Sequence, residues 1–120
     1  MNSILYFLTV LIGLQHFMFM VLETYFWTKP LGRKIFHMSQ NQAEAQKVLA
    51  SNQGLYNGFL GAGLFWSVLQ QDDLMADQLK IFFLTCVLLA GLWGGFTFSK
   101  RIIRIQALPA LIALIILLFV

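Results

Sequence analysis

The chain has 120 residues, of which 59% are hydrophobic and 11% are charged, and its formal net charge is +3 at pH 7. Its length predicts a single domain over residues 1–120. A charged share this far below the usual value of about 25% leaves too few polar side chains for a water-exposed surface, which excludes an ordinary soluble fold. The positive charge does not indicate nucleic-acid binding, because the basic residues flank apolar runs and no polar surface surrounds them.

Four apolar runs each approach the roughly 20 residues that span the core of a bilayer. The sequence therefore predicts an all-α polytopic integral membrane protein, folded as a four-helix bundle. The expected spans are residues 3–27, 50–69, 78–99 and 105–120. The first run is expected to be retained as a span, because no basic region precedes it and no small-residue cleavage pattern follows it.

The first span is expected to end at Trp27, since Lys29 precedes a proline and the residue before a proline disfavours helix. The basic segment that follows, around Arg33 and Lys34, is expected either along the headgroup surface or as a simple loop. Ser39 and Gln42 have the spacing of a capping box, so the next helix should begin near residue 40. That helix can reach about thirty residues, with its polar first third outside the hydrocarbon.

The remaining connections carry opposite charge. Residues 70–73 and Asp77 form an expected acidic turn, and a basic turn follows the third span. Pro109 in the first turns of the last span is compatible with a helix start. Every basic residue except Lys80 flanks the first or the third connection: Lys29, Arg33, Lys34, Lys47, Lys100, Arg101 and Arg104. The positive-inside rule then predicts a cell-membrane protein with both basic connections cytoplasmic and both termini outside.

Two stripes of small residues offer surfaces for close helix contacts. They comprise Ala50, Gly54, Gly58 and Gly61 in the second span, and Cys86, Ala90, Gly94 and Thr97, flanked by Gly91 and Gly95, in the third. Small residues let helices approach closely in a membrane, so the two stripes are expected to pack on each other. They could instead form a homo-oligomer, through Gly54, Gly58 and Gly61 or through Ala90, Gly91, Gly94 and Gly95, and glycine is also simply common in membrane helices.

Polar side chains inside the apolar runs mark the candidate site. His16 and Glu23 share one face of the first span, about 10 Å apart along the axis. Depth along the helices predicts that Glu23, Gln53 and Asn57 converge in the cytoplasmic half of the bundle, with His16 deeper. The expected ligand-binding residues are Glu23, Gln53, Asn57, Tyr56, Trp27 and His16, and Trp93 is a further aromatic candidate.

The residue types limit the chemistry of this site. The single Cys86 and the lone membrane-embedded His16 supply neither a metal ligand set nor a haem ligand pair, so no cofactor or metal is expected. A buried glutamate beside amides suits binding or transport of a small molecule, a proton or a cation. The alternatives are a structural or interaction subunit, in which the polar residues only position helices, and a membrane-embedded enzyme for a lipophilic substrate, with Glu23 or His16 as acid–base group. The sequence favours a binding role over an enzyme.

Glu23 and Trp27 form a Glu-x-x-x-Trp motif, Phe36 follows, and residues 52–63 read Asn-Gln-Gly-x-Tyr-Asn-Gly-x-Leu-x-Ala-Gly. This pattern resembles a family of small, mostly bacterial, four-span membrane proteins known as a domain of unknown function. The resemblance covers nearly the whole chain and implies an integral membrane protein, with no established activity to carry over.

Two functional groups of membrane proteins are similar in part. Small multidrug-resistance transporters also have four spans and a lone glutamate in the first, but the strong charge bias here differs from the weak bias of their dual-orientation dimers. Membrane-associated glutathione and eicosanoid enzymes loosely resemble residues 42–57, although the arginine that they use in that helix is absent.

Overall fold

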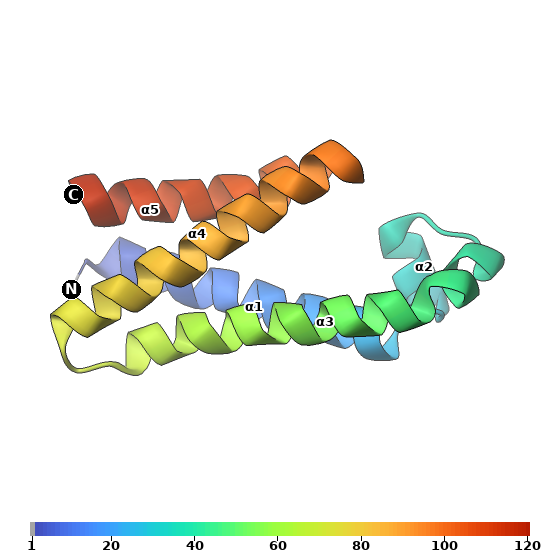
Figure 1. Ribbon diagram of the computed structural model, residues 1–120, viewed down its shortest axis with the longest axis horizontal. Coiled ribbons are helices and arrows are strands. Elements are labelled where there is room, and N and C mark those ends of the chain that lie inside the picture. Colours follow the sequence, from blue (N-terminus) through green and yellow to red (C-terminus); the bar gives the residue numbers. More distant parts are fainter. Residues whose placement is uncertain (1) are drawn as a thin grey trace. The chain divides into compact units, whose positions relative to one another are not determined.

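The computed structural model describes residues 2–120, and within that range every regular element is a helix (Figure 1). The all-α prediction is therefore confirmed. The elements are α1 (Ser3–Tyr25), α2 (Pro30–Phe36), α3 (Gln40–Leu69), α4 (Asp73–Thr97), the π-helical turn η1 (Ile103–Ala107) and α5 (Leu108–Phe119).

The helices form two compact units. Among the described residues, one unit comprises residues 2–13 together with residues 62–120, and the other comprises Leu14–Gly61. The long helices α1 and α3 contribute a segment to each unit. The candidate site residues at positions 16–57 all belong to the Leu14–Gly61 unit.

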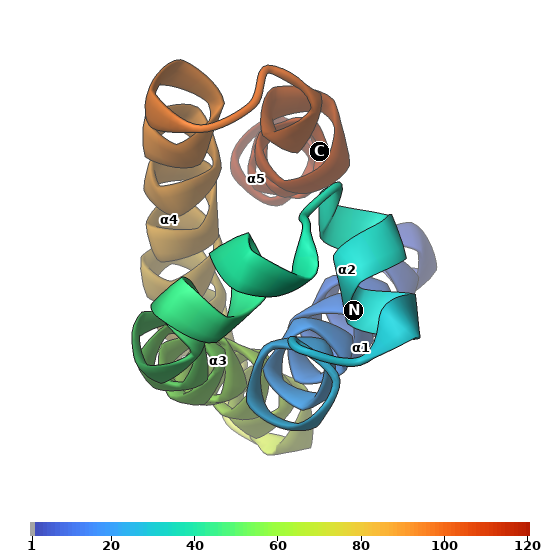
Figure 2. The ribbon, with the colours of Figure 1, turned by 90° about the vertical axis from the view of Figure 1, so that its right-hand side faces the viewer.

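The short helix α2 gives the Leu14–Gly61 unit a sharp corner after α1 (Figure 2). Pro30 occupies its first turn, where a missing N–H costs no helix bond. Gly32 lies against the carbonyl oxygen of Phe26, and a Cβ there would overlap that atom. The helix ends at Phe36, and the following residue His37 caps it with a left-handed φ of 54°. The basic segment is thus a helix, which excludes the loop interpretation.

The start of α3 follows the predicted capping box. The backbone N–H of Gln42 donates to Ser39 Oγ at 3.1 Å, and the backbone N–H of Ser39 donates to Gln42 Oε1 at 2.9 Å. Two N–H groups without helical partners are satisfied in this way. The helix is 30 residues long, as expected.

Glycines of α3 bring this helix close to α1. A Cβ at Gly54 would lie 2.7 Å from Thr24 Oγ1, and one at Gly58 would lie 2.6 Å from Met20 Sδ. At Gly54 the Cβ would also lie 3.2 Å from the backbone oxygen of Met20, which cannot move without separating the helices, whereas the flexible Met20 side chain could move away from a Cβ at Gly58. The small stripe of α3 therefore faces α1.

The other unit contains α4, η1 and α5. The acidic turn expected over residues 70–73 and Asp77 is wrong in part, because α4 begins at Asp73 with Asp72 as its N-cap and includes Asp77. The Asp72 side chain accepts a hydrogen bond from the N–H of Leu74 at 3.2 Å. Aspartate is preferred at N-caps and in first helical turns. Its side chain accepts hydrogen bonds from the free N–H groups, and its negative charge interacts favourably with the helix dipole. The acidic segment was thus the beginning of a helix.

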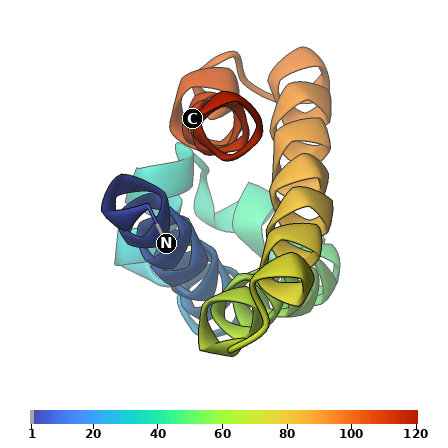
Figure 3. The same ribbon diagram turned by 90° about the vertical axis from the view of Figure 1, so that its left-hand side faces the viewer.

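The glycines of α4 face the last helical segment, which lies beside α4 (Figure 3). A Cβ at Gly91 would lie 2.6 Å from the backbone nitrogen of Ala107, and one at Gly95 would overlap the side chain of Ile103. The prediction that the two small stripes pack on each other is therefore wrong. A small-residue stripe shows that a close partner exists, but not which helix it is. Oligomerisation through these residues stays a prediction.

Within residues 2–120, two helices are long and apolar enough to cross a membrane, namely α1 and α4. The last helical segment, Ile103–Phe119, is apolar but shorter. The apolar character of α3 is lowered by its polar first turns and by the amides of Asn52, Gln53 and Asn57.

Candidate functional site

Glu23 is the centre of the polar cluster and is only 2% exposed. Gln53 Nε2 donates to Glu23 Oε2 at 2.7 Å, and Asn57 Nδ2 donates to Glu23 Oε1 at 2.5 Å. Gln53 and Asn57 are four residues apart, so they lie on one face of α3 and reach the same carboxyl group. The predicted convergence of these three side chains is confirmed.

The two amides use part of the hydrogen-bonding capacity of Glu23. A carboxylate offers about four lone-pair sites, and Gln53 and Asn57 occupy one on each oxygen. Bonds to an ionised group are stronger than those between neutral groups, which offsets part of the cost of removing Glu23 from solvent. Further donors can still bind the free lone pairs.

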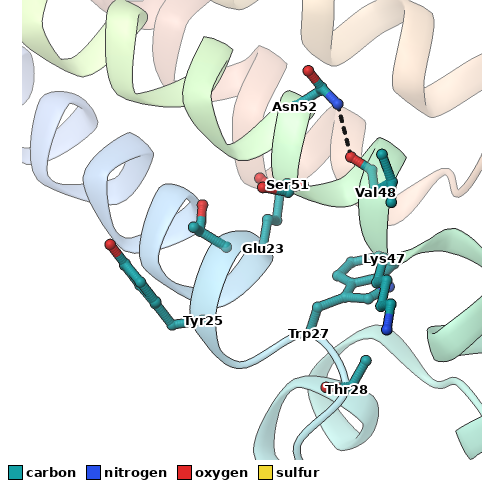
Figure 4. Close-up of a pocket in the computed structure, with 9 residues that line it drawn as sticks. Glu23, Tyr25, Trp27, Thr28, Lys47, Val48, Ser51 and Asn52 are labelled. Carbon is teal, nitrogen blue, oxygen red and sulfur yellow. Dashed lines mark hydrogen bonds between the residues drawn. The ribbon is translucent and has the colours of Figure 1, made fainter.

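A pocket of about 360 Å³ lies beside this cluster (Figure 4). It is bounded by the last turn of α1, the residues after it, and the first half of α3. Its lining residues are Glu23, Thr24, Tyr25, Trp27, Thr28, Lys47, Val48, Ser51 and Asn52. Glu23 therefore connects the buried amide cluster to an open cavity.

The polar groups of the pocket differ in how far they are engaged within the protein. Trp27 Nε1 is buried and has no hydrogen-bond partner among the described residues. Asn52 uses its Nδ2 to donate to the carbonyl oxygen of Val48 at 2.9 Å (Figure 4). Lys47 forms an ion pair with Glu44 at 3.2 Å, but both side chains are largely exposed. An unsatisfied buried donor costs free energy, so an acceptor on a ligand would stabilise the Trp27 side chain.

The other expected site residues have different positions. Trp27 lines the pocket and packs on Phe36 with ring centroids 4.9 Å apart. Tyr56 is 59% exposed and does not line the pocket. His16 is fully buried, with its ring edge-on to that of Phe19 at 5.5 Å, and it also lies outside the pocket lining. Trp93 is exposed and belongs to the other unit.

Sequence reasoning missed most of the pocket walls. Thr24 and Thr28 on one side, and Lys47 and Ser51 on the other, line the cavity. Lys47 and Ser51 are four residues apart in α3, which places both on one helix face, whereas Thr24 lies in the last turn of α1 and Thr28 in the turn after it. That periodicity is present in the sequence, but the register of α3 against α1 was needed to bring the two pairs together.

Lys80 is a second buried charged residue that the sequence did not reveal. It lies in α4 and is 1% exposed, although it was expected beside the acidic connection. Across the described part of the chain, no cluster of three or more His, Cys, Asp or Glu side chains could hold a metal ion.

Comparison with known proteins places the chain in a family. The family model described as "Protein of unknown function (DUF1304)" matches residues 10–118. The "Uncharacterized protein YpaA" of Lactococcus lactis subsp. lactis (strain IL1403) is 34% identical over 112 residues, which cover 90% of this chain and 91% of that protein. No solved structure matches significantly. The extent of both matches shows that the chain belongs to the family of proteins of unknown function called DUF1304.

Proposed function

We propose that this chain is an integral protein of the cell membrane that binds a small, polar, amine-bearing molecule through Glu23. The observation that carries the proposal is the double role of Glu23, which is held by two amides and also lines a cavity. A buried carboxylate with free lone pairs recognises ammonium groups by charge-assisted hydrogen bonds. Amine binding of this kind is the function of a receptor or the first step of a transport cycle.

The proposed membrane placement has four spans with both termini outside. The apolar length of α1 and α4 supports two of the spans. The basic residues around α2 and after α4 support a cytoplasmic position for these connections. In this orientation the pocket opens at the cytoplasmic end of α1, where Tyr25 and Trp27 suit an interfacial position.

A structural role for Glu23 is the second candidate. The observation in its favour is that each carboxylate oxygen already accepts one amide hydrogen bond from α3. Each such hydrogen bond between membrane helices contributes about 0.6–2 kcal/mol to the stability of their association. A purely structural Glu23 would stabilise the fold without binding any added amine.

The binding proposal is tested with methylammonium and ethanolamine as probes. Saturating ligand stabilises a protein by about 2.7 kcal/mol at 100 times Kd, so both probes should raise the Tm of the full chain in detergent micelles. Glu23→Gln should abolish the shift, since the amide lacks the charge. Asp77→Asn, which neutralises an exposed carboxylate in α4, is the matched control and should respond like wild type.

The two candidates give different outcomes in the same experiment. If neither probe shifts the wild-type Tm and Glu23→Gln lowers the Tm without ligand, the structural role replaces the binding role. Should Glu23→Gln fail to fold, Glu23→Asp retains the charge on a shorter side chain and should bind both probes more weakly than wild type.

A further inference from the structure

The pocket combines one negative and one positive side chain. Glu23 from α1 and Lys47 from α3 are the charged groups of its lining, and the hydroxyl and amide groups belong to Thr24, Tyr25, Thr28, Ser51 and Asn52. Charge complementarity determines which partners a site accepts. A lining that carries one negative and one positive side chain therefore matches a ligand that has both an ammonium group and an anionic group.

Two side chains of the pocket offer donors to an anionic group. Trp27 Nε1 is buried and has no acceptor within residues 2–120, and the ammonium group of Lys47 carries three donors. The ion pair of Lys47 with Glu44 is exposed to solvent, and such surface pairs contribute about 0–1 kcal/mol. Lys47 can therefore turn to a ligand at little cost, and these groups together suit an oxyanion.

The different burial of Glu23 and Lys47 determines how a ligand would be oriented in the pocket. Glu23 is almost fully buried, whereas the Lys47 side chain is 58% exposed. In Figure 4 the Glu23 side chain extends from α1 toward Ser51, and Lys47 lies on the far side of the Trp27 indole. The ammonium group of a ligand would thus enter first, and its anionic group would stay near the mouth.

Size and position favour a small headgroup. Pockets for drug-sized ligands measure about 300–1,000 Å³, and a volume of about 360 Å³ lies at the lower end of this range. In the proposed membrane orientation, the pocket lies at the end of an apolar helix next to the basic helix α2. This is the depth at which phospholipid headgroups lie.

We propose that the pocket binds a phosphoethanolamine group, in which a primary ammonium is linked to a phosphate ester. The ammonium binds Glu23, and the phosphate binds Lys47 and the indole N–H of Trp27. This inference rests on the proposed amine-binding function and adds the anionic half of the ligand. The same chemistry occurs in a phosphatidylethanolamine headgroup and in soluble glycerophosphoethanolamine.

Soluble compounds test the recognition itself. Affinity of the full chain in detergent is measured for glycerophosphoethanolamine, glycerophosphocholine and ethanolamine by the shift in Tm with concentration. Glycerophosphoethanolamine should bind at least about tenfold more tightly than either other compound, because a charge-assisted hydrogen bond contributes about 1.5–3 kcal/mol. Glycerophosphocholine keeps the phosphate but has no N–H donor for Glu23.

Two variants test the anionic half of the site. Lys47→Met and Trp27→Phe should each weaken glycerophosphoethanolamine binding about tenfold, a clearly larger loss than either causes for ethanolamine, which has no phosphate. Lys34→Met and Trp93→Phe, which alter side chains outside the pocket lining, are the matched controls and should bind like wild type. Lys47 is an exposed helical residue, so its replacement keeps the fold even if Trp27→Phe does not.

Lipid nanodiscs then distinguish the two sources of the headgroup. If the lipid is the ligand, discs of phosphatidylethanolamine should raise the Tm above that in phosphatidylcholine discs, and Lys47→Met should remove the difference. Equal Tm values in both discs, with tight binding of the soluble compound, would identify the soluble compound as the ligand.

The outcome also separates this inference from the function on which it rests. If ethanolamine binds through Glu23 but glycerophosphoethanolamine binds no more tightly, or if both pocket variants bind it like wild type, the phosphoethanolamine proposal is wrong and amine binding stands. If neither compound binds, both proposals fail.

Discussion

Glu23 and Lys80 are both buried charged residues, but their surroundings differ. Glu23 accepts two amide hydrogen bonds from α3. The amine of Lys80 has no hydrogen bond or ion pair within the described chain, although Asp77 and Asp73 lie close enough to act on it electrostatically. Burying a charge without a hydrogen-bonded partner is costly, so the two residues should affect stability in opposite ways.

Replacing Lys80 with methionine should therefore stabilise the fold. Methionine has a similar length and adapts to irregular packing, and the change removes a charge from a side chain that is only 1% exposed, where burial disfavours the charged form. Because Asp77 and Asp73 offset part of this cost, we expect Lys80→Met to raise the free energy of unfolding by about 1 kcal/mol, measured by denaturant titration in detergent micelles. Lys34→Met, at an exposed position in α2, should change it by less than about 0.5 kcal/mol.

A lower stability of Lys80→Met would contradict this interpretation. It would show that Lys80 contributes a favourable interaction in the membrane, such as a contact of its amine with a lipid headgroup.

At the scale of the helices, glycines decide which neighbours come into close contact. Gly54 and Gly58 face α1, and Gly91 and Gly95 face the segment from η1 to α5. The π-helical turn η1 comes just before Pro109. Proline has no N–H to donate to the carbonyl of residue 105, and its ring would clash with that carbonyl in a regular α-helix. The wider turn, closed by a bond from the N–H of Leu108 to the carbonyl of Ile103, precedes the proline without breaking the helix.

Alanine substitutions at two glycines should have opposite effects. A Cβ at Gly54 would lie 3.2 Å from the backbone oxygen of Met20 and 2.7 Å from Thr24 Oγ1, so Gly54→Ala must separate α3 from α1. We expect a loss of about 1–3 kcal/mol and a weaker response to amine probes, because Gln53 and Asn57 move away from Glu23.

Gly94→Ala is the matched control for this prediction. Its Cβ would lie 3.3 Å from Ile102 Cγ2 and meets no backbone atom, so Ile102 has to shift by only a few tenths of an ångström, and alanine favours helix over glycine by about 1 kcal/mol. Its Tm should be equal to that of wild type or higher. Equal destabilisation by both substitutions would show that backbone freedom, and not the α1–α3 contact, requires Gly54.

For the whole molecule, the proposed four-span topology depends on whether α3 crosses the bilayer. α1 and α4 have the length and apolar composition for a span, whereas α3 carries amides in its middle turns. In the proposed four-span topology, Gln53 and Asn57 are compatible with a crossing because Glu23 accepts their hydrogen bonds. The position of α3 therefore determines the topology.

Cysteine labelling should reveal whether α3 crosses. In a Cys86→Ser background, Gln71→Cys lies after α3 and Ser39→Cys lies before it. We expect a membrane-impermeant maleimide to label Gln71→Cys in intact cells and Ser39→Cys only after lysis, since basic connections stay in the cytoplasm. Labelling of both positions under the same condition would show that α3 remains on one side, and Cys86→Ser alone controls for background.

Much of the fold was determined by the sequence itself. Apolar runs, the capping box at Ser39 and Gln42, and the proline at position 30 act locally, so they predicted helices and the start of α3. The convergence of Glu23 with Gln53 and Asn57 was also predictable. Polar groups in apolar helices have few possible partners, and depth along each helix limits which of them can meet.

Only the tertiary structure decided the partners of the glycine stripes, the burial of Lys80 and the walls of the pocket. These features depend on the rotation and register of one helix against another. Many side-chain contacts set that geometry together, and no short stretch of sequence encodes it. A small residue permits a close approach by any neighbour. For this reason Lys47 and Trp27 became recognisable as parts of one site only when α1 and α3 were placed side by side.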